Sequence, residues 1–589
     1  MYYDNFVLPF VIGLYSLLIY LAIKYIRWIR TFPKADKLRI IKGLFTTKTL
    51  RSIREIITES IVHNKIFRTN PFLGYMHMCF GLGWFLLIVV GKIESTVYHT
   101  SLFNPPYFAI FFRFFHPANE TFPGSNTFAF LMDFILLFIL SGVFLAWMKR
   151  LYSRVVGLKK TTKHRPFDLL ILTVLWMIFP LRLLAESFTS GARGGGSFLT
   201  HTLGDFFNNF LPLENLIYPA WWAYSSALGL FFILLPGSRY MHIPTEMVFI
   251  FLKNWGVKQG RKANAFTEFQ LYSCSRCGIC IDRCQLNTSL GINDTQSVYF
   301  LKKLRHKKDY TTLPENCLMC GRCESSCPVG IELNAIRLSK RPDMSRINKD
   351  TYSYIQPIDI KTAKVAYFAG CMGHLTPTVI AAMKHIFGKA GVDYTFLDES
   401  KGICCGRPMM LSGNQAITSV IVEKNRQMIY ASGAEILVTT CPICYKIFKE
   451  EYKLKIKVMH HSEYIDELMK KNMLTTARSN YKTILHNPCE LGRGSKVFEA
   501  PDNVLKTVSQ KLSTKYDGKN SLCCGGSLAN THISAEQRTK IGSDALDLYA
   551  TYNPDIIATA CPLCKKTFTK KASDIQIKDI AELVAENCR

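Results

Sequence analysis

The protein has 589 residues, 48% of them hydrophobic, and a formal net charge of +28 at pH 7. This length allows several domains, and because the apolar residues are concentrated in the first 250 positions, the composition predicts a membrane half and a soluble half. Much of the lysine and arginine lies in short loops beside apolar runs, and no basic, aromatic-interleaved patch stands apart from them. We therefore expect no nucleic-acid partner.

Five apolar segments are long enough to cross the hydrocarbon core of a bilayer, near residues 6–26, 72–91, 127–148, 168–188 and 216–236. The first has no small-residue cleavage site after it and is expected to be retained as a membrane helix. Stretches 24–68 and 149–165 are rich in lysine and arginine, whereas the loops 92–126 and 189–215 carry few. The positive-inside rule therefore predicts a multi-pass protein of the cytoplasmic membrane, in contact with lipid, with its N-terminus outside and its C-terminal half in the cytoplasm.

Two histidines lie toward the predicted cytoplasmic side of this region: His77 early in the second segment and His242 just after the fifth. Two imidazoles from different helices at one depth are what a b-type haem needs as axial ligands. A polar ring inside a membrane span also favours a functional role. The alternative is that His77 makes a helix–helix hydrogen bond and that His242 is an interfacial residue. The spacing alone leaves both readings open.

Eight cysteines follow the membrane half in two runs of C-x2-C-x2-C-x3-C spacing, which is the bacterial two-cluster ferredoxin pattern. In that pattern three cysteines of a run bind one cluster and the fourth reaches the other cluster. One predicted [4Fe-4S] cubane set is Cys274, Cys277, Cys280 and Cys327, and the other is Cys317, Cys320, Cys323 and Cys284. Gln285 stands where the first run would usually have proline. Zinc sites prefer four paired ligands and disulfides need an oxidising compartment, so both alternatives fit poorly.

The last 225 or so residues contain an internal repeat with a period near 120 residues. Each copy has the pattern C-x(n)-C-C-G-x(n)-C-P-x-C. The first copy contributes Cys371, Cys404, Cys405, Cys441 and Cys444, and the second contributes Cys489, Cys523, Cys524, Cys561 and Cys564. Short apolar strands alternate with helical stretches such as 376–390 and 535–552, which predicts an α/β fold. Thr376 suits the N-cap of the first stretch and Pro377 its first helical position.

Taken together, these patterns predict a multidomain protein. Its parts are an all-α five-helix transmembrane domain, a helical two-cluster [4Fe-4S] ferredoxin domain, a linker and a duplicated α/β cysteine-rich domain. The predicted boundaries are 1–250, 251–340, 341–363, 364–475 and 476–589.

Two stretches of the membrane half resemble the haem-ligating stretches of the respiratory nitrate reductase gamma subunit. They are YMHMCFG at 75–81 and LPGSRYMHI at 235–243. That family usually binds two haems, but the positions of the second pair are Leu87 and Tyr224 here. The resemblance therefore implies one haem b, held by His77 and His242.

The repeat closely resembles the cysteine-rich domain of heterodisulfide reductases. In that family a complete set of five cysteines implies a noncubane [4Fe-4S] cluster on which a disulfide can be cleaved. Both copies are complete, so the resemblance implies two such clusters. The alternative is that one copy, the first, binds zinc or a conventional cluster. We expect catalysis at the second copy, on Cys489, Cys523, Cys524, Cys561 and Cys564.

The order of modules is similar to membrane-bound heterodisulfide reductase subunits fused into one chain, and to the iron–sulfur proteins that link electron-transfer flavoprotein to menaquinone. The resemblance implies an oxidoreductase that passes electrons between menaquinone or another quinone and a cytoplasmic partner. That partner is a disulfide substrate, or electron-transfer flavoprotein or another flavoprotein. A rival of another class is a membrane redox sensor or scaffold that binds clusters without turnover.

Overall fold

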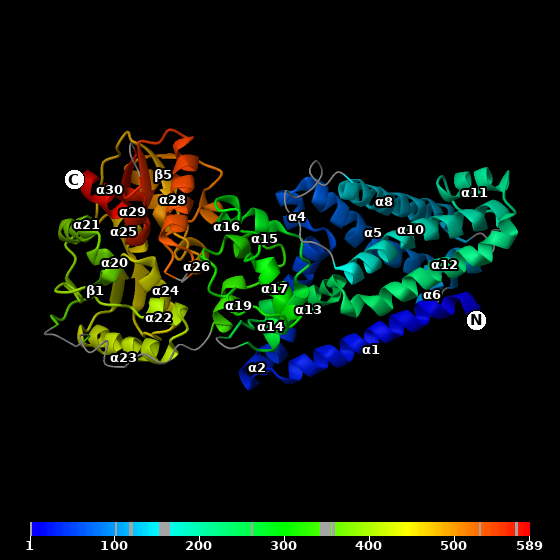
Figure 1. The fold of residues 1–589 in the computed structure, drawn as a ribbon, viewed down its shortest axis with the longest axis horizontal. Coiled ribbons are helices and arrows are strands. Elements are labelled where there is room, and N and C mark those ends of the chain that lie inside the picture. Colours follow the sequence, from blue (N-terminus) through cyan, green and yellow to red (C-terminus); the bar gives the residue numbers. More distant parts are fainter. Residues whose placement is uncertain are drawn as a thin grey trace. The chain divides into compact units, whose positions relative to one another are not determined.

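The computed structural model describes residues 3–99, 103–116, 122–151, 165–260, 263–341, 355, 360–528, 532–571 and 575–589 (Figure 1). The chain forms two compact units. The first comprises Met1–Gly278 with Pro328–Ile331, and the second comprises Ile279–Cys327 with Glu332–Arg589. The division falls inside the predicted ferredoxin domain, and the predicted linker at 341–363 lies largely outside the described residues. Each unit is therefore considered by itself.

Five helices of the described first unit are long and apolar enough to cross a membrane, which confirms the predicted segments. They span Asn5–Arg30, Pro71–His99, Ser125–Lys149, Pro166–Arg193 and Leu213–Gly237. Only 28% to 39% of the most apolar stretch of each helix is buried. Since the rest of that apolar surface faces outward, these helices need apolar surroundings, as lipid provides.

The five long helices are α1 (Leu8–Arg30), α5 (Pro71–His99), α8 (Ser125–Leu151), α10 (Pro166–Arg193) and α12 (Leu213–Leu234). In Figure 1, α12 packs against α1 and α10, and α5 packs against α8. Small residues allow the closest approach: a Cβ added at Gly13 would lie 2.6 Å from Cα of Gly229. Arg182 and Glu186 form a buried ion pair of 2.8 Å on one face of α10, as their spacing of four residues predicts.

Shorter helices complete the first unit. They are α2 (Lys34–Leu44), α3 (Thr47–Glu55), a π-helix at Ile56–Ile61, α4 (Asn64–Thr69), α6 (Pro106–Ile110), α7 (Phe112–Phe115), α11 (Thr200–Asn208), α13 (His242–Asn254) and α14 (Ala265–Ser273). The buried carboxylate of Asp133 accepts hydrogen bonds from the backbone N–H groups of Leu199 and Thr200, at 3.0 and 2.9 Å, and so holds the start of α11. Asp133 therefore has a structural role.

The second unit begins with short helices around the cysteine runs. They are α15 (Ile279–Asp282), α16 (Gln285–Thr288), α17 (Ser297–Arg305), α18 (Arg322–Ser325) and α19 (Leu333–Ser339). The buried guanidinium of Arg337 donates to the carbonyls of Leu313 and Thr295. This side chain therefore links the loop before α17 to the loop after it.

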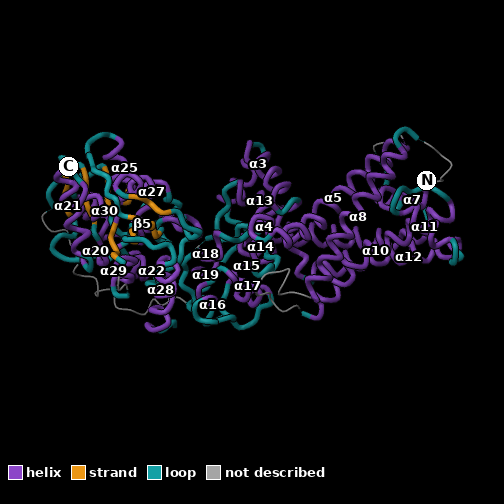
Figure 2. Tube along the Cα trace, turned by 90° about the horizontal axis from the view of Figure 1, so that it is seen from above, coloured by secondary structure: helices purple, strands orange, loops and turns teal. Residues whose placement is uncertain are grey.

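Each cysteine-rich copy folds around a four-stranded, fully parallel sheet (Figure 2). The first sheet has the order β2-β1-β3-β4 and the second has the equivalent order β6-β5-β7-β8. Their strands are β1 (Val365–Phe368), β2 (Tyr394–Phe396), β3 (Ile436–Thr439), β4 (Lys457–His460), β5 (Lys482–His486), β6 (Gln510–Leu512), β7 (Ile556–Thr559) and β8 (Gln576–Asp579). The predicted duplication of an α/β domain is confirmed.

Helices connect the parallel strands, as crossover connections require. The first copy has α20 (Gly370–His374), α21 (Pro377–Lys389), α22 (Arg407–Leu411), α23 (Gln415–Ala431), α24 (Pro442–Glu450) and α25 (His461–Lys470). The second has α26 (Gly492–Ser495), α27 (Glu499–Val508), α28 (Ala535–Ala550), α29 (Pro562–Thr569) and α30 (Ile580–Asn587). Pro377 begins α21 as predicted. The Thr376 side chain, however, does not cap this helix, because its hydroxyl donates back to the carbonyls of Met372 and Gly373.

Candidate functional site

The two copies hold their cysteines at matching places in the fold. Cys371 lies in α20, directly after β1, and Cys489 follows the matching strand β5. Cys441 and Cys561 are the N-cap residues of α24 and α29, and each of these helices begins with proline. Backbone N–H groups at a helix N-terminus favour a thiolate or an anionic cluster. The fold thus places one cysteine of each copy, Cys441 and Cys561, at a helix N-terminus that can stabilise negative charge.

A sharp turn carries the adjacent cysteines of each copy. Gly406 and Gly525 follow them and adopt φ of 81° and 82°, a left-handed conformation that side chains rarely adopt. A Cβ added at Gly525 would lie 2.3 Å from the carbonyl oxygen of Arg538. Both the backbone conformation and the packing therefore explain why glycine ends the Cys-Cys-Gly motif.

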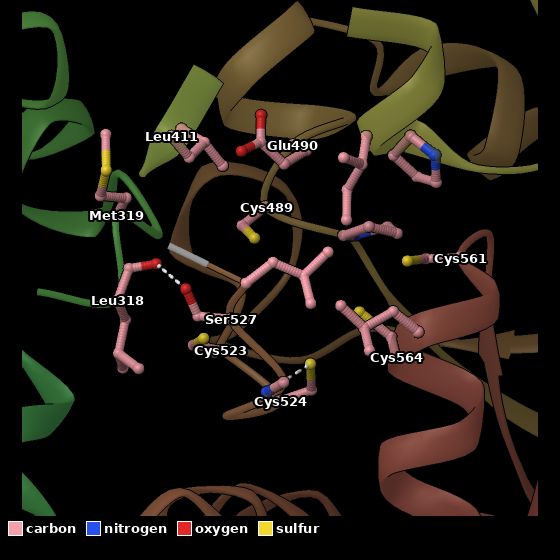
Figure 3. A pocket seen from close by; sticks show the side chains of 16 residues that line it. Leu318, Met319, Leu411, Cys489, Glu490, Cys523, Cys524, Ser527, Cys561 and Cys564 are labelled. Carbon is pink, nitrogen blue, oxygen red and sulfur yellow. Dashed lines mark hydrogen bonds between the residues drawn. The ribbon is translucent and has the colours of Figure 1, made fainter. Parts of the chain in front are cut away.

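All five cysteines of the second copy line one cavity (Figure 3). The remaining walls are mostly apolar and come from both copies and from the ferredoxin part, at Leu318, Met319, Leu411, Ile443, Leu528 and Leu563. The cavity is thus lined by five cysteines and by mostly aliphatic side chains.

The donor set fits an iron–sulfur cluster. The ten cysteines of the two copies are thiols without disulfide bonds. Burial, followed by the neighbouring thiols, raises the pKa of Cys371 to about 12 and that of Cys404 to about 11. Iron bound to these thiols would displace their protons, because a metal ligand must be the thiolate. The N–H groups of Gly406 and Gly526 already point at the sulfurs of Cys404 and Cys524, at 3.4 Å each.

Over the residues that the structure describes, no group of three or more His, Cys, Asp or Glu side chains is arranged around a single metal-sized point. Zinc or a conventional cluster in the first copy therefore stays a prediction made from the sequence.

A buried charge network joins the two copies beside the cavity. Glu490, which follows Cys489, accepts from Arg407 at 3.4 Å and from Lys446 at 3.3 Å. Burial raises the pKa of this carboxyl, but the two cations more than offset the effect, so its pKa lies below the ordinary value. Glu490 is therefore an anion at neutral pH, and it ties the Cys-Cys-Gly turn of the first copy to the first cysteine of the second.

The ferredoxin cysteines are divided between the units. Cys274 and Cys277 belong to the first unit, and the other six belong to the second. Within the second unit the charges of Cys317 and Cys320 act on both Cys284 and Cys323, so these four thiols are neighbours. This is the grouping that the interleaved assignment requires. The sulfur of Cys317 also accepts from the Met319 N–H at 3.3 Å.

The two proposed haem ligands both lie in the first unit, His77 on α5 and His242 at the start of α13. The Nδ1–H of His242 donates to the carbonyl of Arg239 at 2.8 Å. This bond fixes the tautomer and places the lone pair on Nε2, the arrangement typical of metal-binding histidines. Tyr224, the other residue considered at the membrane, instead lies in hydrogen-bonding contact with Arg182.

His63, which the sequence analysis did not select, is a third imidazole at this place. Its ring centre lies 5.3 Å from that of His77. Two metal–nitrogen bonds of about 2 Å each would hold the rings farther apart than this, so no iron fits between His63 and His77 as they stand. His63 adopts φ of 58° just after the π-helix, a conformation that no sequence pattern foretells for a residue other than glycine.

A buried aspartate anchors the first cysteine run beside the loop that leads to His242. Asp168 accepts from the backbone N–H of Arg239 at 2.8 Å and from the guanidinium of Arg276 at 2.9 Å. Arg276 stands between Cys274 and Cys277, and Arg239 is three residues before His242. One carboxylate thus holds the start of the ferredoxin domain against the loop that carries the proposed haem ligand.

A second buried carboxyl, Glu246, lies one turn after His242 on α13 and accepts from Ser60 Oγ on the π-helix at 3.2 Å. Burial raises its pKa from 4.5 to about 7, with Ser60 and nearby lysines opposing the shift. Glu246 therefore exchanges its proton in the physiological pH range.

We predict a pH-dependent stability gain for Glu246→Gln. Folding takes up a proton at Glu246 between pH 4.5 and 7, so wild-type stability falls as pH rises through this window. The variant should match the wild type near pH 4.5 and exceed it above pH 7, by up to roughly 3 kcal/mol. Thermal unfolding in detergent across this range measures the difference. A difference that does not change with pH would contradict the prediction.

Comparison with known proteins agrees with this geometry. Residues 365–449 and 483–569 each match the family model described as Cysteine-rich domain, and residues 270–331 match the 4Fe-4S dicluster domain. The chain is 25% identical over 401 residues to one of the subunits of the dihydromethanophenazine:CoB–CoM heterodisulfide reductase of Methanosarcina acetivorans. That match covers 55% of this chain and 96% of the relative.

Two bacterial relatives are also similar. The probable iron-sulfur-binding oxidoreductase FadF of Bacillus subtilis is 23% identical over 351 residues, which cover 55% of this chain and 47% of that protein. The EtfAB:quinone oxidoreductase of Syntrophomonas wolfei is 26% identical over 223 residues, which cover 35% of this chain and 31% of that protein. The chain thus contains a 4Fe-4S dicluster domain and two cysteine-rich domains, in which it is similar to a heterodisulfide reductase subunit and to other iron–sulfur oxidoreductases, together with five helices apolar enough to cross a membrane.

Proposed function

We propose that this protein is a membrane-bound oxidoreductase that transfers electrons between menaquinone, or another quinone, and a redox partner in the cytoplasm. The observation that carries the proposal is the cavity on which all five cysteines of the second copy converge, in the same unit as the second ferredoxin run. The five apolar helices support the other half of the proposal, in which electrons are exchanged with a carrier dissolved in the membrane. The distribution of lysine and arginine between the loops favours the cytoplasmic membrane, with the N-terminus outside.

In this proposal the chain holds four clusters and one haem. The two ferredoxin sets would hold cubanes, the two cysteine-rich copies would hold noncubane clusters, and His77 and His242 would hold haem b. When bound, these groups carry single electrons. The chain's own residues supply the rest: thiolates as ligands, backbone N–H groups that stabilise the thiolates, and mostly aliphatic walls around the second copy's cysteines.

Two directions of electron flow compete within this function. The heterodisulfide reductase relatives favour reduction of a disulfide at the second copy with electrons from quinol. The EtfAB:quinone oxidoreductase relative favours oxidation of a reduced electron-transfer flavoprotein, with electrons passing to quinone. A cavity with mostly aliphatic walls and one ion-paired acid, Glu490, favours a disulfide with an uncharged body over a highly charged one. A redox sensor or scaffold would hold the clusters without turnover.

The test uses the full chain purified in detergent and reduced with dithionite. Its reoxidation is followed separately with a menaquinone analogue, with uncharged and anionic disulfides, and with oxidised electron-transfer flavoprotein. We expect rapid reoxidation by the quinone analogue and by one cytoplasmic partner, and the identity of that partner decides the direction. Normal cluster loading without reoxidation by any of these oxidants would favour the sensor or scaffold.

We predict that His77→Ala and His242→Ala each abolish the bis-histidine haem spectrum. The reason is that the Nε2 atom of each imidazole is assigned to the iron. His63→Ala is the matched control, because it removes an imidazole at the same place that is not assigned as a ligand, and this variant should keep the spectrum. Loss of the spectrum in His63→Ala together with its survival in His242→Ala would move the second ligand to His63.

A further inference from the structure

A direct sulfur contact connects the ferredoxin part to the second cysteine-rich copy. Within the second unit the thiols of Cys320 and Cys523 lie in hydrogen-bonding contact. Cys320 is assigned to the second cubane and Cys523 to the second copy. Both pack against the same small core, which contains Leu286, Leu318, Ile533 and Ile541. The two predicted cluster sites are thus adjacent through their own ligands.

Gln285 holds this contact through both ends of its side-chain amide. Its Oε1 accepts from the N–H of Cys523 at 2.6 Å, and its Nε2 donates to the carbonyl of the same residue at 3.2 Å. The side chain is only 2% exposed. Gln285 directly follows Cys284, which is assigned to the second cubane. The two hydrogen bonds of Gln285 therefore connect the backbone next to Cys284 to the backbone of Cys523, a cysteine of the second copy.

Two further side chains reinforce the junction. Arg493 donates to the carbonyl of Cys320 at 2.7 Å and to that of Ser521 at 2.8 Å. Ser527 Oγ donates to the carbonyl of Leu318 at 2.8 Å, a bond drawn in Figure 3. The junction is therefore fixed on both sides of the sulfur contact. Among these described side chains, Gln285 alone bonds to both the N–H and the carbonyl of one cysteine.

The first copy meets the ferredoxin part differently. Its described contact there is a small apolar cluster in which Leu411 packs with Met319, Cys317 and Leu338. The charges that act on Cys371 and Cys404 come from cysteines of their own copy. Within the described residues, the second copy alone thus brings a cysteine against a ferredoxin cysteine.

We propose that Gln285 is a positioning residue that fixes the electron-transfer contact between the second ferredoxin cluster and the second cysteine-rich copy. This inference rests on the proposed function only in requiring that both sites hold clusters. One electron leaves the reduced site at Cys284, Cys317, Cys320 and Cys323 and is taken up by the oxidised site of the second copy. No bond forms or breaks in this step. Proline, the usual residue at this position, could hold the local turn but could not hold the junction.

The local backbone allows a sharp test of this role. Gln285 is the first residue of α16, where proline is well tolerated, and Cys284 has φ of −87° and ψ of 120°, which suit a residue before proline. Gln285→Pro should therefore keep the cysteine run folded while removing the amide. Gln285→Met keeps the length and volume and also removes both bonds. Gln285→Glu retains the acceptor for the Cys523 N–H but loses the donor to the Cys523 carbonyl, so its transfer rate should fall between those of the wild type and Gln285→Met.

The experiment uses the full chain in detergent with two readouts. Freeze-quench EPR after rapid reduction measures the transfer rate between the two sites, and EPR power saturation during a redox titration measures their magnetic coupling. In Gln285→Pro and Gln285→Met we expect transfer to slow by roughly tenfold, from the loss of two hydrogen bonds that hold the junction, together with weaker coupling. Iron content and midpoint potentials should stay unchanged.

Gln296→Met is the matched control. Gln296 is equally buried in the same module, but its side chain donates to the carbonyl of Ile292 within its own loop. It should lose stability without slower transfer. Two results would overturn this inference and leave the proposed function standing. One is an unchanged transfer rate and coupling in Gln285→Pro and Gln285→Met, and the other is an equal loss of transfer rate in Gln296→Met. A wild-type chain with far fewer than roughly sixteen cluster irons, and none in the second copy, would overturn the cluster assignment and the inference together.

Discussion

Asp168→Ala is expected to destabilise the first unit by roughly 3–5 kcal/mol, because it leaves a buried guanidinium without its carboxylate. Asp168 is 1% exposed and its partner Arg276 is 6% exposed. The same substitution also removes the acceptor for the backbone N–H of Arg239. A buried, unpaired charge and an unsatisfied peptide group therefore arise in one step.

The exposed pair of Arg193 and Glu214 provides the control. Its side chains are 46% and 64% exposed, and its closest N–O distance is 3.7 Å. Such surface pairs contribute about 0–1 kcal/mol, so Glu214→Ala should scarcely change thermal unfolding in detergent. Asp168→Asn should fall between the two, since its amide oxygen can still accept from Arg239 while the charge is lost. Equal unfolding temperatures for Asp168→Ala and Glu214→Ala would contradict the buried ion pair.

Asp168→Ala should also affect the redox centres beside it. Arg276 separates Cys274 from Cys277, and the Nη2 of Arg239 donates to the carbonyl of Ser275. Without the carboxylate, this stretch loses the group that holds it against the loop leading to His242. We expect reduced iron content and a perturbed haem spectrum in the same variant, measured by iron analysis and optical spectroscopy.

The repeated fold and the cysteine groups could be predicted because their signals are local and strong. Cysteine spacing, short apolar strands and proline at helix starts are read directly from the sequence, as at Cys441-Pro442 and Cys561-Pro562. The five apolar helices follow from segment length and composition alone. Each of these features depends on residues that are close in the chain.

The junctions could not be predicted because they depend on distant residues. Gln285 looked like a departure from a proline pattern, but 238 positions separate it from Cys523, the residue that it bonds. Asp168 was one polar residue in an apolar helix until the fold placed Arg276 and Arg239 beside it. His63 adopts a left-handed backbone conformation and lies beside His77, and the sequence indicates neither feature. No periodicity or spacing records such contacts.

Gly525→Ala is expected to be the most damaging small substitution in the second copy. Its φ of 82° disfavours any side chain, which costs about 1–3 kcal/mol. The added methyl would also lie 2.3 Å from a backbone oxygen of α28, so the helix or the turn must shift, at a further roughly 1–3 kcal/mol. The turn carries Cys523 and Cys524, so the variant should lose the second-copy cluster as well as stability.

Gly406→Ala is a matched comparison, because this residue occupies the same position in the first copy with φ of 81°. Its added methyl would meet a side-chain carbon of Ile421 at 3.3 Å, a contact that a small side-chain movement relieves. The strain of the turn is then shared by both variants, and the collision with backbone is specific to Gly525→Ala. Iron content, thermal unfolding and reoxidation by the cytoplasmic partner should all fall further in Gly525→Ala. If Gly406→Ala instead abolished reoxidation while Gly525→Ala retained it, the chemistry would belong to the first copy.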